Sequence, residues 1–499
     1  MDRNSLTDFF RDVSNQNYTV LSIDLSRNGT TVSALQNILV PLDTPTTTSD
    51  EQIEASVRNQ QFFQGKWTRF NILVVSFLKF CRDVDPWADY YTNCDIIFEY
   101  FSSLNNCLLN DSYQVDSLID LYLETLDYVV RIAKSLDANY TIWGTRKYQF
   151  LSYTSSIVSR LFNSIKKPVN KNPKVSKYET SRIANGKQRI LLTIINELNT
   201  IYFLIDSPQL CSNIFKNFKP KCSSDSFRTA FPIVEQIKYR YLLGRYYLMN
   251  ERIANAFVQL NSSFASLLLI SQLSASSNPA NVNVTVGNSV DPRLRRNMAR
   301  LLKYLIPAGL ILGKLPNMDL VRQIDSDLSN RYTELIRYMK SGNIHGINHW
   351  LQTHETELRR QKLLLLLVEK LPMVAYTFLL KTLIENWSFP QGVNRLPYDL
   401  FERALRVSID NNNNNNTNNG SNPEIDTVVT IYNGIQRVES AENILVTLIN
   451  LGYLRANCFP LLKTLVFKRS NDIREILPPI DDRVLQMFPL NSDDDWLER

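Results

Sequence analysis

The sequence predicts an all-α fold, a solenoid of stacked helical hairpins, that ends in a small α+β subdomain. Three observations predict this class. Only 14 of the 499 residues are glycine, which is few for a sheet-rich fold. Apolar residues recur with helical periodicity from about Trp67 onward. An alternating, β-branched run, KTLVFKRS at Lys463–Ser470, stands near the C-terminal end and predicts a strand there.

Composition and charge narrow the class of protein further. Hydrophobic residues make up 44% of the chain, and its length favours two or three structural units. The net charge of +6 permits an anionic partner without requiring one. The start lacks a secretory signal, and no window reaches about 18 uninterrupted apolar residues. The six cysteines include no C-x-x-C pair, so we expect reduced core thiols in a nuclear or cytosolic protein.

Helical stretches and polar interruptions alternate along the chain. The predicted helices of the first half are the stretch from Phe70 that stops at Pro86, and 94–111, 116–136, 148–165 and 189–205. Three polar segments are predicted to be loops, namely 166–188, Ser271–Pro292 and the asparagine tract Asp410–Asp426. We expect the asparagine tract to be disordered and to hang outside the fold.

The stretch Tyr239–Leu260, YRYLLGRYYLMNERIANAFVQL, tests the solenoid prediction. The tetratricopeptide template asks for Leu-Gly-x-x-Tyr on one helix and a small and a large apolar residue on the next. The residues that match it are Leu243, Gly244, Tyr247, Ala256 and Leu260. Arg240 occupies the position of the template's tryptophan, so the match is partial. We therefore predict a packed helical hairpin rather than a base-stacking surface, with Arg240 and Arg245 at its edges.

The C-terminal part changes character. Amphipathic helices are predicted at Ala375–Trp387 and Tyr398–Ile409, and another from the N-cap Ser440 to near Gly452. Helices followed by a hairpin are the order of a winged helix. The predicted regions are N-terminal helical repeats at 1–230, a second set of repeats at 231–372, and a winged-helix subdomain with the asparagine-rich insertion and a tail at 373–499.

Several long stretches resemble the PCI-domain family of scaffold subunits, which occur in the proteasome lid, the signalosome, a translation-initiation factor and TREX-2. The similarity is to the PCI subunits of TREX-2, the transcription-coupled mRNA-export complex. The stretches that carry it are YRYLLGRYYLMNERIANAFVQL, RLLKYLIPAGLILGKLPN, YTELIRYMKSGNIHGINHWLQTHE, LLLLLVEKLPMVAY, FLKFCRDVDPWADYYTNCDIIFEYF, SPQLCSNIFKNFKPK, LVTLINLGYLRANCFP and VLQMFPL. Nearly the whole chain is covered, apart from the three polar loops.

The resemblance implies a fold of TPR-like PCI repeats and a non-catalytic scaffold and nucleic-acid-binding subunit of TREX-2. It places the protein in the nucleus, on the nucleoplasmic side of the nuclear pore. It implies two partners, a GANP-type scaffold subunit bound through the PCI region and a small acidic DSS-type protein along the helices. Adjacent winged helices of the heterodimer would form a platform for RNA or DNA. A signalosome-like subunit that acts by protein contacts only stays an alternative, as does a hydrolase with carboxylates on the solenoid.

The predicted wing is the candidate nucleic-acid interface, because residues 455–471 contain bases and no acid. The candidate residues are Arg455, Lys463, Lys468, Arg469 and, just beyond the run, Arg474. On a short hairpin these bases can reach successive phosphates and release counterions. The segment contains no set of side chains suited to recognising nucleotide base edges, so we expect binding without sequence specificity. Exposed bases at a wing tip are also compatible with an ordinary soluble surface.

Two further basic clusters are open to more than one interpretation. The loop 166–188 and its C-terminal flank contain Lys166, Lys167, Lys171, Lys174, Lys177, Arg182, Lys187 and Arg189 against Glu179. It could be an RNA-contacting arm or a solvated linker. A predicted helix start contains Arg293, Arg295, Arg296 and Arg300, which is unfavourable for the helix dipole. This second cluster hints at an acidic partner such as a DSS-type protein.

Metal and cofactor sites are not expected. His345 and His349 have the i,i+4 spacing of a helical metal pair, but Gly346 is expected to disrupt the helix there. His354 stands in HETEL, which lacks the second histidine of H-E-x-x-H. No cysteine is near in the sequence, so polar helix surface is the favoured interpretation.

Catalytic motifs are equally weak. Lys187 follows a glycine ahead of a helix, but Gln188 stands where a phosphate-binding loop needs Ser or Thr. Asp83 and Asp85, in RDVDPW, fit helix-end capping and turn chemistry better than acid–base work. We therefore expect a non-enzyme, with no small-molecule substrate and no membrane association.

Overall fold

The computed structural model describes residues 3–40, 47–109, 115–166, 186–222, 227–276, 291–409, 441–470 and 472–498. The chain divides into two compact units. Unit 1 comprises Met1–Tyr239 and Trp496–Arg499, and unit 2 comprises Arg240–Asp495. The boundary falls inside α14 (Ile233–Met249).

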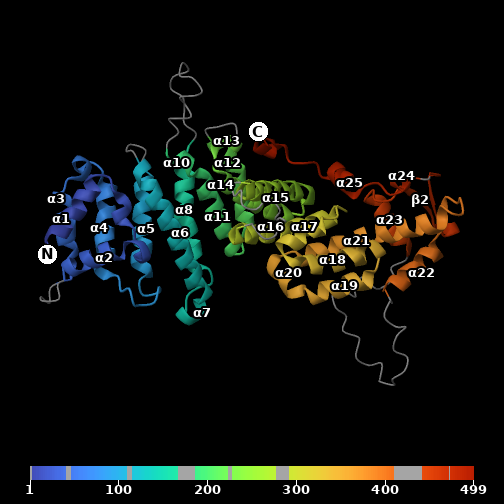
Figure 1. Ribbon diagram of the computed structural model, residues 1–499, viewed down its shortest axis with the longest axis horizontal. Coiled ribbons are helices and arrows are strands. Elements are labelled where there is room, and N and C mark those ends of the chain that lie inside the picture. Colours follow the sequence, from blue (N-terminus) through green and yellow to red (C-terminus); the bar gives the residue numbers. More distant parts are fainter. Residues whose placement is uncertain are drawn as a thin grey trace, which may run out of the picture. The chain divides into compact units, whose positions relative to one another are not determined.

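Unit 1 is built of helices that pack on their neighbours in sequence. α4 packs on α5, α5 on α6, and both α6 and α11 on α8 (Figure 1). The helices of this unit are α1 (Arg3–Ser14), η1 (Tyr18–Leu21), α2 (Leu25–Leu39), α3 (Asp50–Asn59), η2 (Phe62–Gly65), α4 (Thr68–Asp83), α5 (Cys94–Leu108), α6 (Asp116–Ala138), α7 (Tyr140–Trp143), α8 (Gln149–Ser164), α10 (Gly186–Arg189), α11 (Leu191–Leu204), η3 (Pro208–Leu210), α12 (Cys211–Lys221), α13 (Phe227–Ala230), the start of α14 and part of η7 (Ser492–Glu498).

The cysteines behave as the sequence predicts. All six are free thiols, and all but the half-exposed Cys458 are buried. Burial raises the pKa of the Cys107 thiol to about 12 and that of Cys94 to about 11, so both stay protonated at neutral pH. These cysteines are therefore small apolar core residues.

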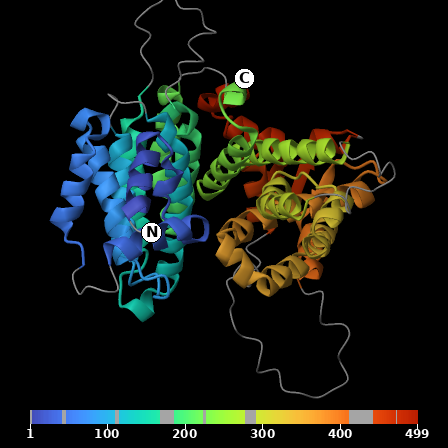
Figure 2. The same cartoon turned by 60° about the vertical axis from the view of Figure 1, so that its left-hand side comes forward.

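Unit 2 is also mostly helical (Figures 1 and 2), and it contains a small sheet that is followed by its last short helices. α15 packs on α16, and α18 packs on both α17 and α21. The elements of this unit beyond α14 are α15 (Ile253–Ser276), α16 (Pro292–Ile311), α17 (Met318–Ile324), α18 (Ser326–Ser341), α19 (Ile344–Thr353), α20 (Glu355–Gln361), α21 (Leu364–Leu383), the π-helical η4 (Ile384–Ser388), β1 (Arg395–Pro397), α22 (Tyr398–Ile409), α23 (Ala441–Asn450), β2 (Ala456–Phe459), η6 (Pro460–Leu462), β3 (Thr464–Phe467), α24 (Ile473–Ile476), α25 (Ile480–Met487) and the rest of η7.

The hairpin of α14 and α15 packs as the repeat template predicts. A Cβ added at Gly244 would lie 2.6 Å from Leu260 Cγ, so only glycine permits this approach of the two helices. Ala256 and Leu260 are fully buried. The predicted place of Arg240 at the edge is wrong: its side chain is buried and donates to Gln259 Oε1 at 3.0 Å. Arg240 fills the buried position that the template gives to tryptophan, because its aliphatic stem packs while a polar partner accepts from its guanidinium.

Two local predictions are corrected by the helices of unit 2. The predicted loop from Ser271 begins too early, because α15 continues through Ser276. Gly346 does not disrupt a helix: it lies in the first turn of α19, where its N–H donates to the N-cap side chain of Asn343 at 2.8 Å. A Cβ there would lie 2.4 Å from Tyr338 Cδ1, so the glycine serves helix packing.

α15 is also long and apolar enough to cross a membrane, judged by length and composition alone. Half of its most apolar window is buried inside the structure, as in a core helix. Its hydropathy is thus accounted for by packing against α14 and α16.

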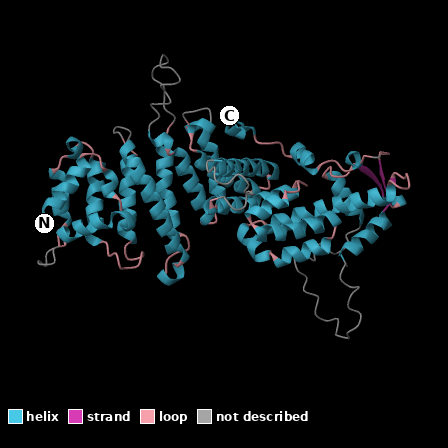
Figure 3. Cartoon of the chain, in the orientation of Figure 1, coloured by secondary structure: helices cyan, strands magenta, loops and turns pink. Residues whose placement is uncertain are grey.

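The strands form a three-stranded antiparallel sheet in the order β1-β3-β2, visible in Figure 3 as the magenta arrows. Leu396 pairs with Leu465, and Cys458 pairs with the same Leu465 from the other side. The strand predicted at Lys463–Ser470 is present as β3, and β2 is the other strand of the predicted hairpin, whereas β1 was not predicted. An all-α architecture with a small C-terminal sheet is thus confirmed, and the winged helix stays a prediction. Ser440 and the asparagine tract lie outside the described residues.

A buried hydroxyl fixes α22, the helix that follows β1, against the helical repeats of unit 2. Ser408 Oγ donates to the carbonyl of Gly342 and accepts from Ile344 N–H at 2.9 Å. Gly342 ends α18 in the left-handed conformation, with a φ of 65°. α22 therefore has a defined position, and so has the sheet strand attached to its N-terminus.

Candidate nucleic-acid interface

The candidate bases lie on and around the hairpin of β2 and β3. In this hairpin Ala456 of β2 pairs with Phe467 of β3 at the open end, and Phe459 pairs with Thr464 at the tip. The five predicted residues, Arg455, Lys463, Lys468, Arg469 and Arg474, are all exposed. The sequence analysis therefore places them on the surface correctly, but the structure does not bring all five together.

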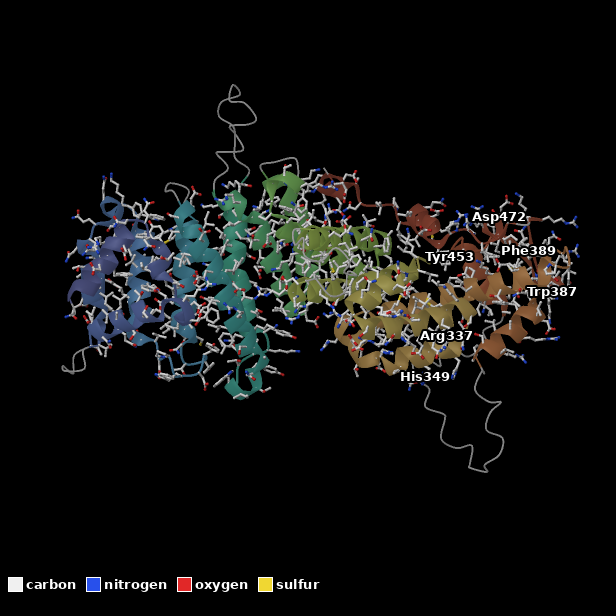
Figure 4. The ribbon with its side chains drawn as sticks, viewed as in Figure 1. Arg337, His349, Trp387, Phe389, Tyr453 and Asp472 are labelled. Atoms are coloured by element: carbon white, nitrogen blue, oxygen red, sulfur yellow. The ribbon has the colours of Figure 1, made fainter. Side chains whose placement is uncertain are left out.

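Four of the basic residues lie at the end of the hairpin away from its turn. Arg455 precedes β2, and its N–H donates to the carbonyl of Ile476 at 2.8 Å, which brings α24 against the start of the hairpin. Lys468 and Arg469 follow β3 directly, and Arg474 is the second residue of α24. Asp472 caps α24 by accepting from Arg474 N–H at 2.9 Å (Figure 4).

Lys463 lies at the opposite end of the hairpin, at its tip. With about 3.3 Å of rise per residue, five residues separate it from Lys468 by roughly 16 Å. The tip around it is apolar: Phe459, Leu461 and Leu462 are all exposed large hydrophobic residues. Lys463 thus belongs to a different surface from the other four bases.

The alternation of the strands defines one basic face of the sheet. Leu396, Leu465 and Phe467 are buried on the inner face. Arg395 pairs with Val466, one residue out of phase with these buried positions, so it lies on the outer face. The same alternation, continued by one residue at each strand end, places Arg455 and Lys468 on that face too. We call Arg395, Arg455 and Lys468 the outer-face triad.

Arg395 was missed by the sequence analysis. It stands 60 positions before Arg455 in a stretch without strand periodicity, and only the pairing of β1 with β3 brings it to the hairpin. A short motif could not have found it, because RLP contains a proline and only three residues. Its position on an edge strand is the one that tolerates proline.

An acid compensates part of this basic face. Lys468 Nζ lies 2.8 Å from Glu475 Oε2. Lys468 lowers the pKa of the Glu475 carboxyl by hydrogen bonding, Ser470 does so as well, and the charge of Arg455 contributes further. The acid-free run of the sequence ended at Asn471, so this neighbour was not anticipated. Glu475 lowers the net charge that a phosphate would meet.

The helices beside the hairpin do not add to the basic face. α23 contains no base, and its one charged residue is Glu442. On α22, Arg403 pairs with Asp399, and Arg406 lies 2.8 Å from Glu402. The arginines of α22 thus pair with acids of their own helix, and α23 supplies no positive side chain. The arrangement suits contact with phosphates by the sheet face.

The remaining predicted motifs are structural in the described residues. Asp85 accepts from Trp87 N–H at 2.9 Å, which is the predicted turn chemistry, and Asp83 pairs with Arg82 at 2.7 Å. Lys187 is buried in the short helix α10. No group of three or more His, Cys, Asp or Glu side chains that could hold a metal occurs in the described ranges.

The histidines lie on helical surface and at a helix junction. His349 is exposed on α19 (Figure 4), and His354 stacks on Trp350 with ring centroids 4.6 Å apart. His354 Nδ1 lies 2.9 Å from the carbonyl of Trp350. These contacts are those of packing residues.

Of the two other basic clusters, the one at the start of α16 lies within the described residues. Residues 167–185 of the basic loop lie outside the described part of the chain. In the arginine-rich start of α16, Asp291 caps the helix by accepting from Arg293 N–H at 2.9 Å. Arg295 donates to the carbonyl of Ile324 at 2.8 Å, and Arg296 and Arg300 are exposed.

Comparison with known proteins relates the whole chain to described relatives. No family model matches it. It is 42% identical over 487 residues to the nuclear mRNA export protein THP1 of Saccharomyces cerevisiae, which covers 97% of this chain and 98% of that protein. It is 28% identical over 191 residues to a PCI domain-containing protein 2 homolog of Drosophila melanogaster, covering 38% and 40%. It is 22% identical over 405 residues to a protein CSN12 homolog of Schizosaccharomyces pombe, covering 79% and 85%. The similarity thus extends over both units.

Proposed function

The chain belongs to the PCI-domain family, together with the nuclear mRNA export protein THP1, and on that premise we propose that it is a non-catalytic scaffold and nucleic-acid-binding subunit of TREX-2. It acts in nuclear mRNA export coupled to transcription, on the nucleoplasmic side of the nuclear pore. The observation that carries this proposal is the 42% identity to an mRNA export protein over 97% of the chain.

Two protein partners follow from this proposal. A GANP-type scaffold subunit binds through the PCI region of unit 2, and a small acidic DSS-type protein binds along the helices. The exposed Arg296 and Arg300 in the first three turns of α16 favour an acidic partner there, since they are one helical turn apart and add positive charge to its surface.

The nucleic-acid contact is the outer-face triad. Three bases on one sheet face can neutralise neighbouring phosphates, and no set of base readers accompanies them, so binding is sequence-nonspecific. RNA and DNA both present the phosphates this face would contact. Lys463 at the apolar tip contributes less than the triad in this proposal.

Charge reversal tests the proposal directly. In the purified heterodimer with the GANP-type subunit, Arg455→Glu with Lys468→Glu should weaken binding of a single-stranded RNA at least tenfold, because two phosphate contacts become repulsive. A matched control is Arg337→Glu with Lys340→Glu on α18 (Figure 4), which makes the same charge change on another exposed surface of unit 2.

The alternative is a PCI scaffold subunit of a signalosome-like complex that acts by protein contacts only. Equal RNA affinity of the wild-type and both variant heterodimers would favour this alternative and remove the nucleic-acid role. Failure to co-purify with a GANP-type subunit would remove the assignment to TREX-2.

A further inference from the structure

An aromatic cleft in unit 1 receives the last residues of the chain. Trp496 lies with its ring centroid 5.1 Å from Phe218 of α12 and 5.5 Å from Phe227 of α13. Both contacts are edge-type arrangements, which aromatic pairs prefer. Trp496 is 6% exposed and Leu497 is fully buried. These residues belong to unit 1 by their contacts, although the whole of unit 2 lies between them and Tyr239 in the sequence.

The walls of the cleft are held by contacts that do not involve the tail. Phe218 and Phe227 each pack on Tyr239, with centroids 5.2 and 5.5 Å apart. The buried Gln236 donates to the carbonyls of Arg228 and Phe231 at 2.9 and 2.7 Å, which fixes the turn between α13 and α14. The cleft therefore has a framework of its own that can persist without its occupant.

Charge is complementary between the cleft and the tail. Arg228 pairs with Glu498 at 2.9 Å. The residue after the Trp-Leu pair is thus an acid held by a base of the cleft. A segment with a Trp-Leu pair and a following acid fits both the apolar walls and Arg228.

We propose that this cleft of α12, α13 and the start of α14 is a peptide-binding site for a segment with a Trp-Leu pair and a following acid, which the chain's own C-terminus occupies in cis. The tryptophan ring and the leucine are the anchors, and the Glu498 carboxylate adds charge attraction to Arg228. A partner protein with such a segment can bind there when the tail leaves the cleft.

Binding in cis has a strong advantage over binding in trans. A short tether holds a ligand at an effective concentration on the order of a millimolar. A free peptide at micromolar concentration therefore cannot displace the wild-type tail, even if the cleft binds it well. Emptying the cleft should reveal the site.

A peptide-binding measurement tests the proposal. The acceptor is the full chain with Trp496→Ala and Leu497→Ala, and the probe is a fluorescein-labelled peptide of residues 491–499, NSDDDWLER. Fluorescence anisotropy should show saturable binding to this acceptor and at least tenfold weaker binding to the wild-type chain. The same peptide with Trp496→Ala should bind the acceptor at least tenfold more weakly.

Two substitutions in the cleft distinguish binding at this site from non-specific binding of the peptide. Adding Phe218→Ala to the acceptor should lower its affinity for the peptide at least tenfold, because the substitution removes one wall of the cleft. Adding Arg228→Glu should weaken it several-fold, and the loss should be larger at low salt. Arg337→Glu on the acceptor is the matched charge control and should leave the peptide affinity unchanged.

Circular dichroism establishes first that the acceptor is folded. If the double variant does not fold, Leu497→Ser, which keeps the indole ring, takes its place with the same peptide arms. The proposal is overturned if the folded acceptor does not bind the peptide, or if its binding is indifferent to Trp496→Ala in the peptide or to Phe218→Ala in the cleft.

Discussion

The α14–α15 hairpin and the β2–β3 hairpin use the same residue types for opposite purposes. In α14, Arg240 is buried on Gln259, and Arg245 lies 4.9 Å from the ring of Tyr304. Around β2 and β3, Arg455 and Lys468 are exposed on the outer face of the sheet. Both regions read as basic and partly aromatic in the sequence. Burial and the neighbouring acceptors decide which base is available to a phosphate and which one holds the fold together.

The largest expected effect is a loss of stability from a substitution in the α14–α15 hairpin. Leu260→Ala should lower the free energy of unfolding of unit 2 by about 2–5 kcal/mol, because Leu260 is fully buried against Gly244 and the smaller side chain leaves a cavity. Thermal or urea denaturation measures the loss. The folded variant should bind RNA as the wild type does, and a selective loss of RNA affinity would instead make this hairpin part of the interface.

A smaller effect is expected from the buried arginine. Arg240→Met should cost about 1–3 kcal/mol in unfolding free energy, because it removes a donor to the buried Gln259 amide. The salt dependence of RNA binding should not change, because a buried guanidinium contacts no phosphate. The exposed Arg337→Met provides the comparison, with a stability change within about 0.5 kcal/mol. A large change in RNA affinity for Arg240→Met would contradict its assignment to packing.

The smallest effect is expected at the acid beside the triad. Glu475→Gln should raise RNA affinity, at most about fivefold, because it releases Lys468 from an exposed ion pair, and exposed ion pairs are weak. A filter-binding titration at low salt measures it best, since salt screens the gain. Glu442→Gln on α23 is a matched control, with the same charge change away from the triad. An unchanged or weaker affinity of Glu475→Gln would mean that Lys468 does not face the nucleic acid.

The sequence supports the helical part of the fold well, because long amphipathic helices repeat their pattern many times. The hairpin of Leu243, Gly244 and Leu260 followed from spacing alone, since close helix approach needs a small residue opposite a large one. The sheet was harder to predict, because β1 and β2 span only three and four residues and show no period. Arg395 and Glu475 join the site through tertiary pairing, which local sequence does not encode.

Some errors came from applying a local rule without its tertiary context. Gly346 was expected to break a helix, yet its N–H donates to the N-cap Asn343 Oδ1, and contact with Tyr338 also holds it in the first turn of α19. Arg240 was expected at an edge because it is charged. In the repeat template its position is a buried packing position, and the Arg240 side chain is buried there despite its charge.

The central claim is that the outer-face triad contacts phosphates. The direct measurement is the slope of the logarithm of RNA affinity against the logarithm of salt concentration, for the heterodimer with wild-type chain and with Arg395→Gln, Arg455→Gln and Lys468→Gln combined. Three lost contacts should make the slope shallower by about 2, since each contact to a single strand contributes about 0.7. Arg337→Gln with Lys340→Gln should leave the slope as it is. An identical slope for the triad variant and the wild type would contradict the account.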